Sequence, residues 1–268
     1  MKYKNAIKKY FIKRSSGIGY FLNLDPKNYK PETFHKLRTE IKKINAVYDI
    51  LNDCVKSFKR TKTFEPLEVI FKSAGDVRDV QVKKKLFEKY KIPPNQNGLA
   101  SQLEKELRNA KEEFNKQITK KIISGVKKNL ASAAEIIAAL KHKDVRSYFK
   151  KEEEKIKELL KHELKPEKLH ELRRQLKIFY YGLRAGGWSR QDVPLHKMDA
   201  VQEVLGKWHD VRVAEKYLAA RKRQKGISKF AKKRLDGIRI KLKKDAEASI
   251  KQVAAHNKEL VTAIKLFS

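Results

Sequence analysis

Cysteine is almost absent from this sequence of 268 residues, which contains only Cys54. A single cysteine excludes an internal disulfide and any zinc site built from several cysteines, and it favours a reducing compartment. No stretch approaches the ~18 consecutive apolar residues that a membrane-spanning helix needs, so no transmembrane segment is expected. We therefore expect a cytoplasmic protein.

Acidic residues are also scarce. The chain has 32 Asp and Glu against 65 Lys and Arg, so its formal net charge at pH 7 is +33. Charge repulsion on this scale opposes folding and concentrates anions around the protein, which favours a phosphate-rich partner over a merely soluble, lysine-rich surface. Apolar residues still make up 40% of the sequence, enough for a chain of this length to bury a substantial core.

Residues 1–24 contain no acidic side chain and six basic ones. This composition is typical of an organellar presequence or a membrane-surface helix. Apolar residues at helical spacing favour a helix of the bundle instead, and there is no secretory hydrophobic segment or cleavage signal. The stripe consists of Tyr3, Ile7, Tyr10 and Phe11.

Complete catalytic motifs are missing too. Gly182 and Gly187 have the spacing of a phosphate-binding loop, but Trp188 and Ser189 follow them instead of a Lys-Ser/Thr pair. The run that begins at His170 lacks the second histidine of a zinc protease motif. Phosphoryl transfer normally uses carboxylates that hold magnesium, and the repeated basic motifs contain none at suitable positions. The sequence therefore predicts no enzymatic activity, no cofactor and no metal site.

What the sequence does contain is an internal repeat. Segment 30–42 reads Lys-Pro-Glu-Thr-Phe-His-Lys-Leu-Arg-Thr-Glu-Ile-Lys and segment 165–177 reads Lys-Pro-Glu-Lys-Leu-His-Glu-Leu-Arg-Arg-Gln-Leu-Lys, with seven identical positions. Each is followed by a second related motif, Gly-Asp-Val-Arg-Asp-Val-Gln-Val at 75–82 and Gly-Lys-Trp-His-Asp-Val-Arg-Val at 206–213. This order predicts a duplicated unit, with an N-terminal bundle at 1–140 and a C-terminal bundle at 141–268.

Apolar residues three and four apart predict helices around both motifs. The seam of the first copy is Phe34, Leu37, Ile41, Ile44, Tyr48, Leu51 and Val55, and that of the second is Leu169, Leu172, Leu176, Phe179 and Leu183. Pro31 and Pro166, each followed by glutamate, suit a first helical turn, so both helices should begin just before the histidine. Further amphipathic stretches cover 66–74, 77–90, 99–139, 145–164, 198–205, 211–224 and 227–266, with loops at 92–98 and 186–194. No strand pattern competes, so the fold class is all-α.

A cationic stripe accompanies the apolar seam. On a helix, His35, Arg38 and Lys42 fall within about 60° of one another, and about 100° from the seam, on a flank where neighbouring helices converge. A guanidinium, an ammonium and an imidazole together suit phosphate oxygens. The second copy repeats the set as His170, Arg173 and Lys177. Local bonding and a solvated face are the alternative interpretation, which the repetition disfavours.

The second motif adds a donor and a carboxylate in each copy. Arg78 is followed by Asp79, and His209 by Asp210. Arg78 and His209 are further candidates for binding phosphate. The aspartates would repel such a ligand, so we assign them either a supporting role, in which they orient the donor, or a role at the start of a helix.

Taken together, these motifs resemble the CHAD family, the conserved histidine α-helical domain, over nearly the whole chain. The resemblance implies two four-helix bundles related by pseudo-twofold symmetry, with a basic groove or pore between them that takes up inorganic polyphosphate. The implied binding residues are His35, Arg38, His170 and Arg173, with Arg78 and His209 from the later motif; Lys42 and Lys177 stand where relatives often have arginine. Because no triphosphate-tunnel domain fits in this sequence, it resembles a stand-alone member, and association with polyphosphate granules follows from the same resemblance.

Two alternatives remain open from the residues alone. A general nucleic-acid binder would also be basic, but many of the ten Tyr, twelve Phe and two Trp lie in helical seams and form no stacking platform for single strands. Non-specific binding of nucleic acid through lysines is the runner-up. A metal-storage role for His35, His170 and His209 is disfavoured by the adjacent cations. The sequence pattern does not indicate an oligomeric state.

Overall fold

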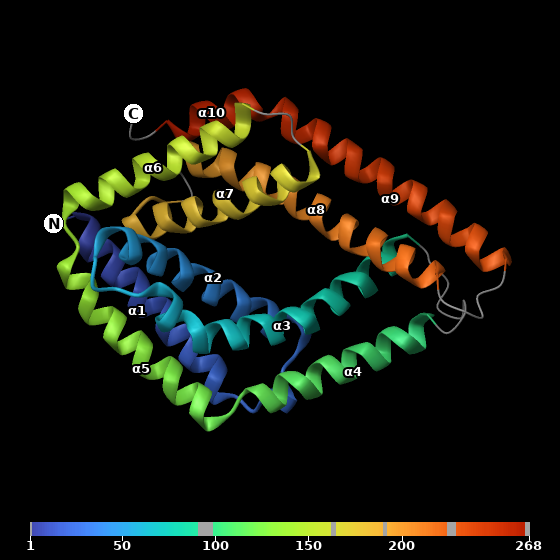
Figure 1. Ribbon diagram of the computed structural model, residues 1–268, viewed down its shortest axis with the longest axis horizontal. Helices are drawn as coiled ribbons and strands as arrows, with labels where there is room; N and C mark the ends of the chain where they lie inside the picture. Colours follow the sequence, from blue (N-terminus) through green and yellow to red (C-terminus); the bar gives the residue numbers. More distant parts are fainter. Residues whose placement is uncertain (1, 91–98, 162–164, 190–191, 224–228, 266–268) are drawn as a thin grey trace.

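The structure is a computed structural model that describes residues 2–90, 99–161, 165–189, 192–223 and 229–265. These residues form helices and no strands, so the all-α prediction is confirmed (Figure 1). In chain order the elements are α1 (Lys2–Asn23), η1 (Pro26–Asn28), α2 (Pro31–Cys54), α3 (Arg60–Lys89), α4 (Leu99–Gln117), α5 (Lys120–Ile136), η3 (Ile137–Ala139), α6 (His142–Lys161), α7 (Pro166–Gly186), α8 (Val193–Lys222), α9 (Lys229–Ala255) and α10 (Asn257–Ile264). Within the described residues, no helix is both long enough and apolar enough to cross a membrane.

The packing of the helices repeats along the chain. In the first half, α2 packs against α1 and α3, and α3 also packs against α4 and α5. In the second half, α7 packs against α6 and α8, and α8 also packs against α9 and α10. This pattern is the one expected of a duplicated unit. Each half contributes five α-helices among the described residues, one more than the predicted four.

Several predicted helix boundaries differ from the observed ones. Residues 99–139, predicted as one stretch, divide into α4 and α5 because the hydroxyl of Thr119 caps α5 by accepting a hydrogen bond from the Ile122 N–H at 3.2 Å. Conversely, a single helix, α3, contains both of the predicted stretches 66–74 and 77–90; it starts at Arg60 and includes Pro66. In the same way, α8 joins 198–205 to 211–222. Tertiary packing of the buried Gly75 and its neighbours outweighs the glycine's low helix propensity. The predicted loop at 92–98 lies outside the described residues.

The apolar seams of both halves meet in one core. Every seam residue predicted on α2 and α7 is buried, and the buried apolar side chains of the two halves form a single contiguous cluster. Gly182 on α7 permits close packing at the junction, since a Cβ there would lie 3.1 Å from Phe149 of α6. Tyr148 of α6 donates a hydrogen bond to Asp49 of α2 at 3.0 Å. Helix α6 therefore contacts both α2 and α7, which also pack directly against each other.

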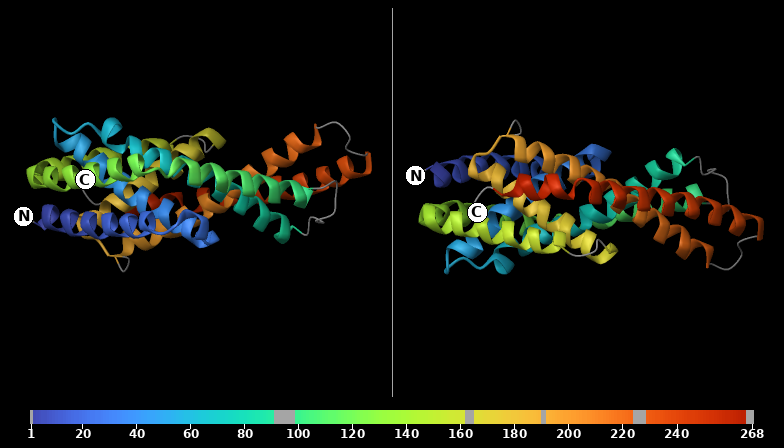
Figure 2. Two further views of the ribbon diagram at one scale, coloured as in Figure 1. Left: turned by 90° about the horizontal axis from the view of Figure 1, so that it is seen from below. Right: turned by 90° about the horizontal axis from the view of Figure 1, so that it is seen from above.

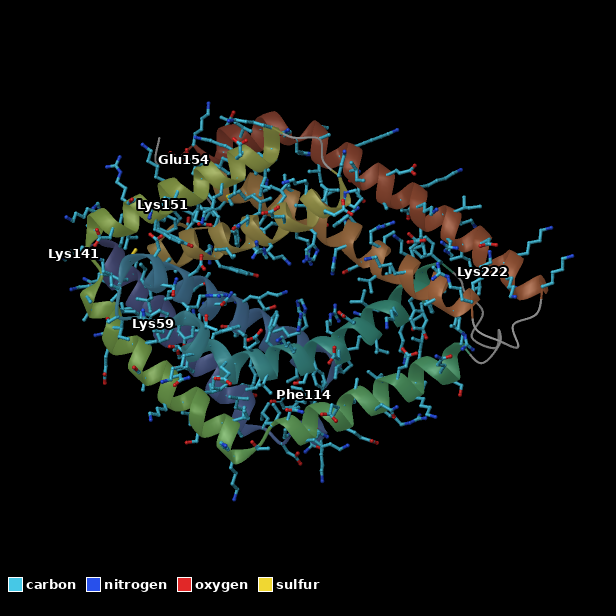
Figure 3. The ribbon with its side chains drawn as sticks, in the orientation of Figure 1. Lys59, Phe114, Lys141, Lys151, Glu154 and Lys222 are labelled. Carbon is cyan, nitrogen blue, oxygen red and sulfur yellow. The ribbon has the colours of Figure 1, made fainter. Side chains whose placement is uncertain are left out.

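The two halves also meet at a second place, far from both termini. Figure 2 shows an elongated molecule with the N- and C-termini at one end and α4, α9 and the ends of α3 and α8 at the other. There Tyr217 of α8 donates a hydrogen bond to Glu106 of α4 at 2.9 Å, and Lys83 of α3 lies over the Tyr217 ring at 4.5 Å. Between the two contact regions, side chains of α2, α3, α7 and α8 point toward one another (Figure 3).

Candidate functional site

Helices α2 and α7 bring the two copies of the cationic stripe together. Each begins as predicted, with proline in the first turn and a glutamate beside it, Glu32 in α2 and Glu167 in α7. The carboxylates interact favourably with the positive ends of the helix dipoles. Since α2 packs directly against α7, the stripes face a common region.

The predicted basic residues lie close enough to influence one another's ionisation. Charges on α7 act on Lys42 of α2, and Arg78 of α3 and Lys177 of α7 both act on His35. The rings of His170 and His209 lie 5.5 Å apart, which joins α7 to α8. We call this group the central cluster; its members are His35, Arg38, Lys42, Arg78, His170, Arg173, Lys177 and His209.

The two lysines show the electrostatic cost of this arrangement. Desolvation, followed by the charges of Lys177 and Arg38, lowers the pKa of Lys42 to about 6. Desolvation, with Arg173 as the next cause, lowers the pKa of Lys177 to about 8. In the free protein at pH 7, Lys42 is therefore mostly neutral and Lys177 mostly charged. A bound anion would favour the charged form of both.

Two of the cluster histidines, His35 and His209, have pKa values shifted toward the neutral form. Desolvation and then the charges of Arg173 and His170 lower the pKa of His209 to about 4. The pKa of His35 is lowered by desolvation and then by Arg78 and Lys42. A neutral imidazole still donates one N–H, so these rings keep a hydrogen bond for an anion without adding charge.

The two aspartates lie near the cluster but do not pair with it. Asp79 and Asp210 are inside α3 and α8, so the alternative role at a helix start is wrong. Desolvation raises the pKa of both carboxyls, and the nearby Arg38 (for Asp79) and Arg173 (for Asp210) oppose this shift. Among the described residues, no carboxylate oxygen lies within the 4.0 Å of an ion pair from any central-cluster cation. The same residues contain no group of three or more His, Cys, Asp or Glu placed to hold a metal ion.

Two residues that support Arg38 were not predicted. The Arg38 guanidinium carbon lies 4.0 Å from the centre of the Phe71 ring, and Nη1 donates a hydrogen bond to the Phe71 carbonyl. Gly75 makes room for this placement, since a Cβ there would lie 2.3 Å from Arg38 Nη1. Phe71 lies outside the repeated motifs. A bulky aromatic residue one helical turn before the motif glycine was the signal that could have identified it.

The second copy lacks this support. Aligning the motifs at 75–82 and 206–213 places Gln202 opposite Phe71 and Gly206 opposite Gly75. A Cβ on Gly206 would meet nothing within 4 Å. The Nε of Arg173 is buried and has no hydrogen-bond partner. Arg38 is therefore fixed by the protein, whereas Arg173 retains an unused donor.

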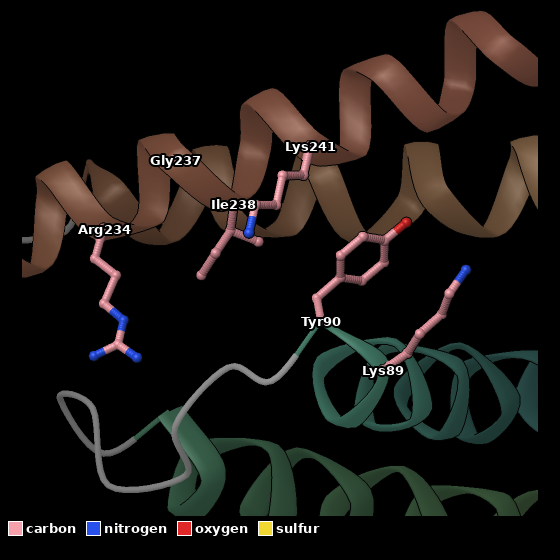
Figure 4. A pocket seen from close by; sticks show the side chains of 6 residues that line it. All are labelled: Lys89, Tyr90, Arg234, Gly237, Ile238 and Lys241. Carbon is pink, nitrogen blue, oxygen red and sulfur yellow. The ribbon is translucent and has the colours of Figure 1, made fainter.

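Two further basic pockets are found among the described residues, and one of them shares His35 with the central cluster. One, of about 460 Å³, lies between α1 and α2 and includes His35 in its lining. The other, of about 490 Å³, lies between the end of α3 and α9 (Figure 4). In this second pocket the Tyr90 ring lies beside α9, near Ile238 and Lys241, and its hydroxyl donates a hydrogen bond to Asp245.

The comparisons with known proteins agree with this fold. The CHAD domain family model matches residues 24–219. The crystal structure of the CHAD domain from the plant Ricinus communis superposes with a TM-score of 0.76 at 15% identity, covering 96% of this chain and 92% of that one. PptA from Streptomyces chartreusis gives a TM-score of 0.73 at 13% identity, covering 97% of this chain and all of the other. No curated protein sequence matches the chain.

The family match spans well over half of the sequence and contains every residue of the central cluster. The chain belongs to the CHAD domain family. At their level of sequence identity, the two solved structures establish the fold alone.

Proposed function

We propose that this chain binds inorganic polyphosphate in a groove between its two halves, through the central cluster. The observation that carries the proposal is that cations from the two halves lower each other's tendency to ionise: after desolvation, Lys177 lowers the pKa of Lys42, and Arg38 is among the charges that lower the pKa of Lys177. Among the described residues, no carboxylate forms an ion pair with either lysine. Desolvated like charges are costly unless a counter-charge arrives. A linear polyanion with a negative charge on every unit would supply several counter-charges at once.

The residues of the central cluster favour polyphosphate over nucleic acid. One face of Phe71, the aromatic ring beside these cations, is covered by Arg38, so that face is not open for base stacking. Each cluster residue offers N–H donors or a positive charge, which match a chain made only of phosphate. The CHAD resemblance of the sequence, which implies polyphosphate uptake, supports the same choice.

We propose further that binding is not accompanied by catalysis. Asp79 and Asp210 lie near the cluster, and the surrounding arginines and lysines oppose the binding of the magnesium ion that phosphoryl transfer requires. Polyphosphate incubated with the protein and magnesium should keep its length on a gel. We place the activity in the cytoplasm, where a fluorescent fusion should coincide with polyphosphate granules in cells that form them.

The test is a competition titration at about 0.15 M salt. Long-chain polyphosphate should displace charge-matched single- and double-stranded nucleic acid, and the reverse should be inefficient. Arg38→Ala combined with Arg173→Ala should make the slope of log affinity against log salt concentration less steep by about 1.4, because each of the two lost phosphate contacts contributes about 0.7. The control, Lys243→Ala with Lys244→Ala, removes the same charge from exposed positions on α9. Equal displacement by all polyanions, or an equal loss in the control, would make the protein a general polyanion binder.

A further inference from the structure

The pocket between α1 and α2, which we call the α1–α2 pocket, is strongly basic. Four cations line it, Lys13, Arg14, Lys36 and Lys43, together with His35. The carboxylate in its lining is Glu40. Its volume of about 460 Å³ is within the range of small-ligand sites.

The charge of Glu40 is already neutralised by two of these cations. Arg14 Nη1 donates to both carboxylate oxygens, at 3.3 and 3.2 Å, and Lys43 Nζ donates to Oε1 at 2.6 Å. Lys13 and Lys36 have no ion-pair partner in the described part of the chain. The Nε of Arg14 is buried without a hydrogen-bond partner. The pocket therefore keeps an excess of donors and positive charge that no protein group uses.

His35 connects this pocket to the central cluster. Its ring lines the α1–α2 pocket, and its ionisation responds to Arg78, Lys42 and Lys177 of the cluster. Because His35 and Lys36 both line the pocket, an anion that extends from the cluster past His35 can reach Lys36.

The corresponding surface of the second half is different. The aligned motifs place Glu171 at the position of Lys36 and Gln175 at that of Glu40. Glu171 lies 3.9 Å from Lys168, so an acidic side chain stands where the first half has a free cation. The repeated motif therefore does not by itself create the pocket, because the position of the unpaired Lys36 is acidic in the second half.

We propose that the α1–α2 pocket is a second anion site, which holds the part of a polyphosphate chain that emerges from the central cluster past His35. Polyphosphate is then bound asymmetrically, with an extension at His35 and none at His170. This inference rests on the proposed function and adds a binding site to it. It also assigns a role in chain-length preference to Lys13 and Lys36.

The test compares two ligands, tripolyphosphate, which the central cluster can hold alone, and long-chain polyphosphate. In the double variant Lys13→Ala with Lys36→Ala, affinity for the long chain should fall about fivefold or more. The slope of log affinity against log salt concentration should become less steep by about 1.4, because two phosphate contacts are lost. Affinity for tripolyphosphate should stay unchanged. Lys243→Ala with Lys244→Ala is the charge-matched control. An unchanged affinity for the long chain, or an equal loss for both ligands, would overturn the inference.

Two further measurements separate this inference from the proposed function. If the double variant Arg38→Ala with Arg173→Ala binds both ligands more weakly, and the pocket variant binds both as tightly as the parent, the cluster binds polyphosphate and the pocket does not. If the parent protein binds neither ligand, the proposed function itself fails. Tyr20, which also lines the pocket, is 63% exposed. If Tyr20→Ala and the pocket variant weaken only single-stranded nucleic acid, the pocket binds nucleic acid and the proposal is wrong.

Discussion

Arg38 lies over the ring of Phe71, with its guanidinium carbon 4.0 Å from the ring centre, and its Nη1 donates a hydrogen bond to the Phe71 carbonyl. The ring face attracts the cation, and the carbonyl fixes its orientation. Lys42 Nζ lies 5.8 Å from the centre of the same ring. Phe71 therefore positions the Arg38 side chain, with Lys42 beside it, before any ligand is present, which lowers the conformational entropy lost on binding.

Gly75→Ala tests this positioning without changing any charge. The new Cβ would lie 2.3 Å from Arg38 Nη1 and must displace the end of that flexible side chain. Alanine also favours the helix by about 1 kcal/mol over glycine, so the fold should be retained. We expect polyphosphate affinity to fall roughly tenfold, as for a lost charge-assisted hydrogen bond, measured by calorimetry. Gly206→Ala is the matched control, because nothing lies within 4 Å of a Cβ there; equal effects in the two variants would contradict the role of Arg38 placement.

The sequence predicted the helical core better than the helix ends. Every seam residue chosen from its spacing on α2 and α7 is buried, because a period of three and four residues directly reflects one face of a helix. The division at Thr119 and the continuity of α3 through Gly75 were missed. Both depend on a local cap or on tertiary packing, which a periodic pattern does not contain.

The residues of the candidate site that occur in both copies of the repeat could be predicted from the sequence, and the supporting residue that occurs in one copy could not. His35 and His170, with their arginines and lysines, were identified because the same trio occurs twice. Phe71 occurs in one copy only, and its importance comes from contact across two helices. The lowered pKa of Lys42 also could not be predicted from the sequence, since it depends on cations from the other half.

Lys42→Met should stabilise the free protein, most strongly at low pH. The folded-state pKa of about 6 lies below the unfolded value of 10.5, so unfolding takes up a proton between these pH values and stability rises with pH. Below pH 6 the full cost of the buried charge is present. Methionine removes that cost, so Tm at pH 6 should rise by about 2–4 °C or more, equivalent to about 1 kcal/mol.

The gain in Tm should shrink as the pH rises toward 10, because folded Lys42 is then neutral and the cost of keeping it unprotonated approaches zero near the unfolded pKa of 10.5. Thermal unfolding at pH 6, 8 and 10 provides the measurement. Lys244→Met, at an exposed position, should show no such pH dependence. A gain that is the same at all three pH values would mean that packing, and not charge, explains the effect.

His209 should act as a neutral donor. Because its pKa is lowered to about 4, polyphosphate binding at pH 7 does not depend on an imidazolium in the free protein. His209→Gln retains an N–H donor and should bind within about threefold of the parent. His209→Phe removes the donor and should cost about 1 kcal/mol, or roughly fivefold in affinity. Equal losses in both variants would assign the imidazole a charged role instead.

Polyphosphate binding should strengthen as the pH falls from 9 to 6, and the lysines should cause this change. Lys177, with a pKa of about 8, and Lys42, with a pKa of about 6, both become charged over this range, and a bound anion raises both pKa values. Binding at pH 7 should therefore take up protons, mainly at Lys42. Calorimetry in buffers of different ionisation enthalpy measures this uptake directly.

Lys42→Arg combined with Lys177→Arg keeps a permanent charge at both positions, so its affinity should vary little between pH 6 and 9 and its proton uptake should approach zero. If the pH dependence persists in the double variant, the titrating groups lie elsewhere, and the central lysines do not set the strength of binding.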